Sequence, residues 1–535
     1  MTDSTHSIIR SAKRFFSGTM LSRMAGMVRD ITMASAFGTQ PSIAAFLVAF
    51  RLSHLLRRLL GEGALQSAFI PQFEKLRHQD PQRAAAFFRS LTLALSILLS
   101  ILVILTMALL WGVLMWANLE EGNAEIAQLT LLMMPSLIFI CLYGINASLL
   151  QCEKSFFTAG VAPVAFNLLW IVGILCLKNL PSKEAMRWLT LFVNLACLAQ
   201  WTVTLHQTKH CLKALGRNFA SPFKNIFSQD ILSLLSPLSL GIIGVGAAQI
   251  NNALDAVFAR YADAAGPAYL WYAMRLQQLP LALFSLAIAA ATLPPLARAI
   301  KNGDKQLFNK FLDFSLRKSV ALMLPISTAI FALGTSSITL IYGHGGFNQL
   351  AVANTALCLG AYGLGLFPMS LVLILVPAFY AQDSYKIPTQ ISIASILLNL
   401  ILNLLLVFVF ERGAASVALA TSISAWMNMF LLLYKLEEKS GYVFSPKLKT
   451  SIWKISCVSL LAMLASLTFS HYWLAESSWM LGKESVFLQT RSSLQQLSLF
   501  ALQALTFLFS LVGASYLLQV DDILKIHRSE SPLNS

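Results

Sequence analysis

Long apolar runs separated by short polar connections extend over almost the whole sequence. A helix needs about 20 apolar residues to cross the hydrocarbon core of a bilayer, and about fourteen runs reach that length. They lie at residues 13–37, 42–70, 86–117, 127–150, 157–178, 185–206, 230–259, 266–297, 313–342, 349–380, 386–410, 414–435, 451–473 and 494–519. The predicted kink positions are Pro237, Pro280, Pro294, Pro295 and Pro368. The pattern predicts an all-α polytopic membrane protein.

The basic residues are concentrated in alternate connections. These connections contain Lys75, Arg77 and Arg83; Lys154; Lys209, Lys213, Arg217 and Lys224; Arg298, Lys301, Lys305 and Lys310; Lys386; and Lys435, Lys439, Lys447 and Lys449. Because cytoplasmic connections are enriched in Lys and Arg, both termini are predicted to be cytoplasmic. The connections between them are poorer in basic residues, and one, ANLEEGNAE, is acidic. The connection from Lys178 to Arg187 is basic and does not fit this pattern.

A weak internal repeat divides the chain. SLLQCEKSFFTAGVAPVAFNLLWI follows the fourth run, and AFYAQDSYKIPTQISIASILLNLIL follows the tenth. Each has a Gln and a charged turn, then a Pro and an apolar run with an inward Asn, Asn167 or Asn399. This offset predicts two pseudo-symmetric six-helix lobes, at 1–220 and 221–440, as in transporters whose halves rock about a midplane site. Residues 441–535, with two further helices, lie outside the repeat.

Composition narrows the chemistry. Hydrophobic residues make up 57% of the 535 residues and charged residues 12%, about half the charged fraction of a soluble protein. The formal charge of +15 is scattered over short connections, which fits membrane topology better than nucleic-acid binding. The seven cysteines form no CxxC pair, so no disulfide framework or metal site is expected. No catalytic or phosphate-cradling motif occurs, so we expect a transporter and no enzyme.

The stretch from Ser22 to Pro71 is apolar enough for a bilayer and yet highly charged. Its charged residues are Arg23, Arg29, Asp30, Arg51, Arg57, Arg58 and Glu62. A charge at bilayer depth costs about 3 kcal/mol on insertion scales, so it usually faces water or a partner. On a continuous helix Arg51, His54 and Arg58 share one face, and Glu62 follows one turn later. Because guanidinium groups bind phosphate oxygens in bidentate fashion, the stretch predicts a cationic cavity for a phosphate-bearing substrate.

Two simpler explanations remain open for this stretch. Arg58 and Glu62 are spaced for an ordinary ion pair within one helix. Arg23 and Arg51 could instead be anchors that reach the cytoplasmic membrane surface. Arg29, in the middle of its apolar run, fits neither explanation well.

The second half of the chain has two further polar features. Arg275 lies inside an otherwise apolar run, where an unpaired arginine is costly, so a cavity position is expected. The second feature comprises Gln249, Asn252 and Asp255 in the seventh run, Asn399 and Asn403 in the eleventh, and Thr421 in the twelfth. A carboxylate with amide, hydroxyl and carbonyl oxygens suits a small cation. An inter-helix hydrogen-bond network is the alternative.

Four segments resemble one known family. SRMAGMVRD, FRLSHLLRRLLGEGALQSAFIP, MRLQQLPLALFSLAIAAATLP and AFYAQDSYKIPTQ resemble the MurJ (MviN) family of lipid II flippases, in the multidrug/oligosaccharidyl-lipid/polysaccharide exporter superfamily. The resemblance implies translocation of the undecaprenyl-diphosphate-linked peptidoglycan precursor, lipid II, from the cytoplasmic to the periplasmic leaflet by alternating access. It also implies two six-helix lobes around a cationic cavity, with residues 441–535 forming a groove for the polyprenyl tail.

The resemblance also implies roles for residues at matching positions. The diphosphate-binding arginines would be Arg23, Arg29, Arg57 and Arg275. Asp30 would orient Arg29, and Arg58 with Glu62 would hold the second helix. Some family members place sodium at positions that match Asp255, Asn399, Asn403, Val417 and Thr421. No cofactor and no firm metal site are implied, and coupling to Na⁺ or to the membrane potential is an expectation.

The expected location is the bacterial cytoplasmic (inner) membrane, with lipid II, membrane lipids and peptidoglycan-synthesis proteins as partners. The chain departs from the family pattern at Ala44, Ser53, His54, Met274 and Asn403. Ala44 stands where the family often has an Asp, and Asn403 stands where an Asp would strengthen a cation site. The lost carboxylates weaken the gating-pair and sodium hypotheses but not the arginine cavity. An exporter of another polyprenyl-linked oligosaccharide or amphiphile in the same superfamily is the alternative function. Drug exporters favour acidic and aromatic cavities, so the arginines disfavour a cationic-drug exporter.

Overall fold

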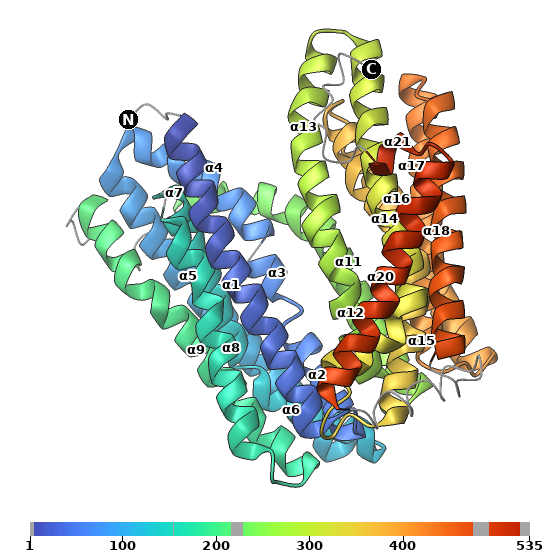
Figure 1. Cartoon of the computed structure of the whole chain (residues 1–535). Coiled ribbons are helices and arrows are strands. Elements are labelled where there is room, and N and C mark those ends of the chain that lie inside the picture. The colour runs from blue at the N-terminus through green and yellow to red at the C-terminus, as the bar shows by residue number, and fades with distance from the viewer. Residues whose placement is uncertain (1–4, 62, 154, 216–227, 474–491, 525–535) are drawn as a thin grey trace. The chain divides into compact units, whose positions relative to one another are not determined.

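The described part of the chain is helical. The computed structural model describes residues 5–61, 63–153, 155–215, 228–473 and 492–524, and these ranges contain no β-strand (Figure 1). Within them, ten helices are long and apolar enough to cross a membrane, or eleven if the bent pair Glu121–Met133 and Ser136–Cys152 forms one span. The predicted all-α membrane fold is confirmed. The count of fourteen spans stays a prediction.

The chain forms two compact units, Met1–Val257 and Phe258–Ser535. The first contains α1 (Thr5–Phe37), α2 (Pro41–Ser53), α3 (Arg57–Leu60), α4 (Ala64–Gln79), α5 (Pro81–Trp116), α6 (Glu121–Met133), α7 (Ser136–Cys152), α8 (Phe156–Leu177), α9 (Ser182–Leu215), α10 (Gln229–Leu232) and most of α11 (Leu235–Ala262). Within it, α1 packs along α8, both α7 and α8 pack along α9, and α2 packs along α6. The lobe boundaries expected near residues 220 and 440 stay predictions.

The second unit is built around the long helices α14 and α15. Its elements are α12 (Gly266–Pro280), the π-helical turn η2 (Leu281–Ser285), α13 (Leu286–Lys301), α14 (Lys305–Tyr342), α15 (Gln349–Tyr380), α16 (Lys386–Leu404), the π-helical turn η3 (Leu405–Val409), α17 (Ala415–Ser440), α18 (Pro446–Trp473), α20 (Ser493–Leu517) and α21 (Asp521–Leu524). One apolar core includes Leu312, Leu375, Leu432 and Leu448, all fully buried. Helices α18 and α20 pack on α14 and on each other (Figure 1), so the helices outside the sequence repeat share this core.

One predicted span is not a single helix. The run at 42–70 consists of α2, which ends at Ser53, the short α3, and α4. His54 follows α2 with φ −100° and ψ 7°, outside helical geometry, and Gly63 precedes α4 with φ +82°. A positive φ is easily adopted only by glycine. The prediction that one continuous helix crosses this region was wrong.

Backbone packing accompanies this interruption. A Cβ atom added to Gly144 of α7 would overlap the carbonyl oxygen of Gly61, which follows α3. Only glycine lets the two backbones approach so closely. The break in the helix therefore seats the α3–α4 connection directly on α7, an arrangement that hydrophobic periodicity does not report.

Other irregularities occur at prolines. Pro280 is the last residue of α12 and is followed at once by η2, a π-helical turn of the kind that often interrupts a helix. Pro294 and Pro295 lie inside α13, and Pro368 lies inside α15, and both helices continue past these prolines. The side chain of Pro237 lies outside the described residues. An additional bend of 47° separates α6 from α7.

The basic connection that did not fit the topology pattern is paired with acid. Lys183 forms an ion pair with Glu121, at 2.5 Å between Nζ and Oε1. Arg187 donates a hydrogen bond from Nη2 to Oε1 of Gln128, at 3.1 Å. The charge of Lys183 is therefore offset by Glu121, the first residue of α6. The topology of this hairpin stays a prediction.

Candidate substrate site

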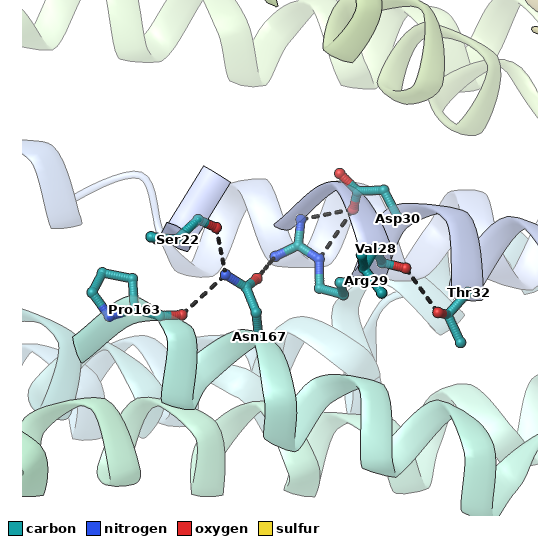
Figure 2. Close-up of polar contacts among 7 residues, drawn as sticks. All are labelled: Ser22, Val28, Arg29, Asp30, Thr32, Pro163 and Asn167. Carbon is teal, nitrogen blue, oxygen red and sulfur yellow. Dashed lines mark hydrogen bonds and ion pairs between the residues drawn. The ribbon is translucent and has the colours of Figure 1, made fainter. Parts of the chain in front are cut away.

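Arg29 of α1 is enclosed by two helices of the first unit. Its side chain is 6% exposed. Its Nε and Nη2 atoms donate to Oδ1 of Asp30, at 3.0 and 2.7 Å, and its Nη1 atom donates to Oδ1 of Asn167, at 3.1 Å (Figure 2). Its guanidinium carbon lies 4.5 Å from the ring centre of Trp170. The guanidinium group is thus oriented by a carboxylate, an amide and an indole ring.

Asn167 of α8 is held in turn by backbone carbonyls. Its Nδ2 atom donates to the carbonyl oxygens of Ser22 and Pro163, at 3.3 and 3.0 Å (Figure 2). These bonds direct Oδ1 toward Arg29. Trp170 lies one helical turn further along α8, so both residues face α1. A cation stacked on an aromatic ring away from water gains about 2 kcal/mol, which helps to offset the desolvation of Arg29.

The ion pair between Arg29 and Asp30 limits what this site can do. Both side chains are only 6% exposed, so removing either partner would leave a buried charge uncompensated. An anionic ligand that reaches Arg29 must share the guanidinium with Asp30 or displace it. The expected orienting role of Asp30 agrees with this contact and stays a prediction.

The other predicted arginines of the first unit have different environments. Arg23 is exposed on α1, about 120° around the helix from Arg29. Arg57, the first residue of α3, is half-buried and close enough to His54 and Cys197 for electrostatic interaction. Arg51, at the end of α2, donates from Nη1 to the carbonyl oxygen of Asn252, at 3.2 Å.

The interruption after α2 removes the shared helix face expected for Arg51, His54, Arg58 and Glu62. That prediction was wrong because it required an unbroken helix from residue 51 to residue 62. Glu62 and the side chain of Arg58 lie outside the described residues, so their predicted ion pair stays a prediction.

His54 has a packing role at the end of α2. Its Nδ1 atom lies 3.0 Å from the carbonyl oxygen of Phe50. Its Nε2 atom lies 3.4 Å from Oγ of Ser136 and 3.7 Å from Sγ of Cys197. The imidazole therefore joins α2 to α7 and α9.

Arg275 occupies a comparable environment in the second unit. It is half-buried on α12, and its guanidinium carbon lies 4.5 Å from the ring centre of Trp271, one helical turn earlier. A guanidinium group can donate two parallel hydrogen bonds to phosphate oxygens through its edge while its face lies on a ring. Two of the four predicted arginines, Arg29 and Arg275, are thus stacked on tryptophans.

Replacing Trp271 with Leu is expected to slow transport about tenfold. The substitution removes a cation–π contact worth about 1 to 2 kcal/mol, so Arg275 would be less well oriented. An energy of that size corresponds to about a tenfold change in rate. The measurement is the substrate translocation rate at matched expression. Trp116→Leu is the matched control, because Trp116 is 90% exposed at the end of α5. Equal rates for the two variants would show that Trp271 does not orient Arg275.

The predicted cation-site residues of the second unit form a hydrogen-bond chain. Asn403 donates from Nδ2 to Oδ1 of Asn399, at 2.8 Å, and Asn399 donates from Nδ2 to Oγ1 of Thr421, at 3.2 Å. Thr421 donates to the carbonyl oxygen of Val417, at 3.0 Å. Asp255 is 1% exposed within the first unit. The oxygens are of the type that hard cations prefer, but Oδ1 of Asn399 and Oγ1 of Thr421 each accept an N–H group from a neighbouring amide.

No cluster of three or more His, Cys, Asp or Glu residues suited to a metal ion occurs in the described ranges. Asn399, Asn403 and Thr421 do form a hydrogen-bond chain that joins α16 to α17, as in the alternative left open by the sequence. The sodium site stays a prediction.

Sequence reasoning did not assign a role to the residues that support the arginines. Asn167 was expected only to face inward, and Trp170 and Trp271 were not singled out. Trp271 could have been found from its spacing of four to Arg275, which places both on one helix face. The Arg29–Asn167 contact joins residues 138 positions apart, so local spacing could not reveal it.

Comparison with solved structures identifies membrane proteins that share this fold. A solved multidrug resistance MATE family transporter of the MOP superfamily has a TM-score of 0.61, at 14% identity, over 82% of this chain and 99% of that chain. The solved lipid II flippase MurJ in an inward closed conformation has a TM-score of 0.74, at 23% identity, over 95% and 99%. These likenesses show the fold: the chain folds as these two membrane transporters do.

Sequence comparison identifies the family. The profile of the family described as "Lipid II flippase MurJ" matches residues 33–488. The "Probable lipid II flippase MurJ" of Chlamydia muridarum is 35% identical over 433 residues, which cover 81% of this chain and 79% of that protein. The chain belongs to the lipid II flippase MurJ family.

Proposed function

We propose that this protein moves lipid II from the cytoplasmic to the periplasmic leaflet of the bacterial inner membrane, for peptidoglycan synthesis. One observation carries the proposal: the buried Arg29 lies against α8 and is oriented by Asp30, Asn167 and Trp170. Buried charges are rare in membrane proteins and usually serve a polar substrate. Membership of the MurJ family and the name carried by the Chlamydia muridarum relative support lipid II as that substrate.

The proposed mechanism is electrostatic. Arg23, Arg29, Arg57 and Arg275 would neutralise the diphosphate, so that the headgroup crosses the membrane in a polar cavity. The two six-helix lobes predicted from the sequence repeat would alternate access to the two sides. The polyprenyl tail would follow a groove along α18 and α20. No covalent step is part of this mechanism, and peptidoglycan-synthesis proteins would consume the delivered lipid.

The direct test is the orientation of lipid II in cells depleted of this protein. Accessibility of lipid II to a periplasmic probe or colicin should fall on depletion and recover when the wild-type gene is expressed. Arg187→Gln is a suitable control variant, because the Arg187 side chain is exposed. Its hydrogen bond to Gln128 lies at the surface of the protein. Normal accessibility after depletion would contradict the proposal, and a defect in another polyprenyl-linked oligosaccharide would favour the alternative substrate.

Ion coupling is proposed to involve Asp255. The variant Asp255→Asn is expected to lose sodium dependence of transport, because the amide removes the one carboxylate of the predicted site. The same variant should lose any sodium-induced rise in thermal stability, a readout that does not depend on transport. Sodium effects equal to those of the wild type would rule out this site, and Asp263→Asn in the α11–α12 connection serves as the matched control.

A further inference from the structure

A polar cavity of about 220 Å³ lies at the start of α14, in the second unit. The connection between α17 and α18 forms its other wall. Three cations, Lys310, Arg317 and Lys447, line it together with the carboxylate of Asp313. None of these residues belongs to the substrate site described above.

The acidic group in this cavity already has two hydroxyl partners. Tyr442 donates from its hydroxyl to Oδ1 of Asp313, at 3.3 Å, and Ser445 donates from Oγ to Oδ2, at 2.8 Å. Burial, and then the Asp313 carboxylate, raise the pKa of Tyr442 above its ordinary value, so its hydroxyl stays protonated and donates. Ser445 Oγ also accepts the backbone N–H of Leu448, at 3.0 Å. Asp313 is therefore a fixed part of the wall.

Arg317, which also lines the cavity, contacts the C-terminal segment. It forms an ion pair with Asp522 of α21, in which Nε and Nη2 both donate to Oδ1. Asp522 also accepts a hydrogen bond from Ser451 of α18. Three cations against two carboxylates leave one positive charge uncompensated. Both lysines are exposed at the mouth of the cavity.

The depth of the cavity matches the phospholipid headgroups. Helix α14 has 38 residues and is about 57 Å long, whereas the hydrocarbon core of a bilayer is about 30 Å thick. From Arg317 to Tyr342 the helix is about 38 Å long, enough to cross that core. Lys310 and Arg317 therefore lie at or beyond the membrane surface, on the side that the basic connections assign to the cytoplasm.

We propose that this cavity binds the phosphate of an acidic phospholipid headgroup, such as that of phosphatidylglycerol. Lys310 and Lys447 would contact the phosphate oxygens, and Arg317, oriented by Asp522, would supply the charge behind them. Basic pockets between membrane helices on this side commonly hold anionic headgroups. A phosphodiester carries a single negative charge, which matches the one uncompensated positive charge. Bound lipid would join α14 to the α17–α18 connection.

Native mass spectrometry of the purified full chain tests this proposal. Wild-type protein should bind phosphatidylglycerol at least tenfold more tightly than phosphatidylcholine with the same acyl chains. The double variant Lys310→Gln/Lys447→Gln should weaken phosphatidylglycerol binding by about tenfold or more. The matched control is Lys305→Gln/Lys449→Gln, which removes the same charge from the same two helices, at exposed positions that do not line the cavity.

Three results would overturn the proposal. The first is that the wild-type protein binds the two lipids equally. The second is that both double variants weaken phosphatidylglycerol binding equally. The third is that millimolar inorganic phosphate displaces the lipid and the cavity shows no preference for the lipid over phosphate. The last result would assign the cavity to a soluble anion. Circular dichroism and gel filtration check that each variant is folded, and the single variant Lys447→Gln provides the measurement if the double variant aggregates.

Discussion

The double variant Arg29→Gln/Asp30→Asn is expected to fold and to lose lipid II translocation. Removing one partner of a buried ion pair typically costs about 3 to 5 kcal/mol, enough to unfold many domains, because the other charge stays buried and uncompensated. Replacing both partners with neutral residues of similar shape avoids that cost. Gln can still donate to Asn167 Oδ1, which keeps α1 attached to α8, but it carries no charge to neutralise a diphosphate.

The comparison with the single variants separates stability from transport. Arg29→Ala and Asp30→Asn should both lower the midpoint of thermal unfolding, and the double variant should recover most of that loss. Transport is measured by complementation of a depletion strain and by the accessibility of lipid II to an external probe. If the double variant transports at the wild-type rate, the charge of Arg29 is not used for the substrate, and the proposed site must be abandoned.

The variant Gly144→Ala is expected to destabilise the protein by about 3 kcal/mol, the upper end of the usual range for overpacking. The new methyl group would overlap the carbonyl oxygen and carbonyl carbon of Gly61. Backbone atoms cannot move aside as the end of a flexible side chain can. Helix α7 would have to separate from the α3–α4 connection, next to Arg57. Transport should fall together with stability for that reason.

Gly513→Ala is the matched control for this prediction. Gly513 lies inside α20, and a Cβ atom added there would meet nothing within 4 Å. Alanine favours a helix by about 1 kcal/mol relative to glycine, so this variant should be neutral or slightly stabilising. The measurement is the unfolding midpoint in detergent. Equal midpoints for Gly144→Ala and wild type would show that the two backbones do not pack in contact.

The placement of the helices followed closely from hydrophobic runs. The run predicted at 349–380 is α15, and the run at 494–519 is α20, at Ser493–Leu517. Each membrane helix must present apolar side chains to lipid along its length. The bilayer therefore requires a long apolar run in the sequence of every such helix, and that run can be recognised without the structure. The sequence also showed that the basic connection before α9 does not follow the alternation of basic and less basic connections.

The interruption between α2 and α4 could not be predicted in this way. Its sequence is apolar enough for a membrane helix and has the spacing of one, although it carries several charges. Within the interruption Gly61 lies against Gly144 on α7, a helix that lies far along the chain from α3. A close approach of two backbones depends on both partners, and a single stretch of sequence describes only one of them.

The sequence alone determined the all-α membrane architecture and the family, because burial in lipid restricts residue types along each apolar run. It also singled out the arginines as candidate site residues. Only the tertiary structure decided what those arginines contact. Arg29 lies against Asn167 and Trp170, and Arg275 lies on Trp271. The charge of a guanidinium group is a property of one residue, whereas its orientation and desolvation depend on the side chains that folding places around it.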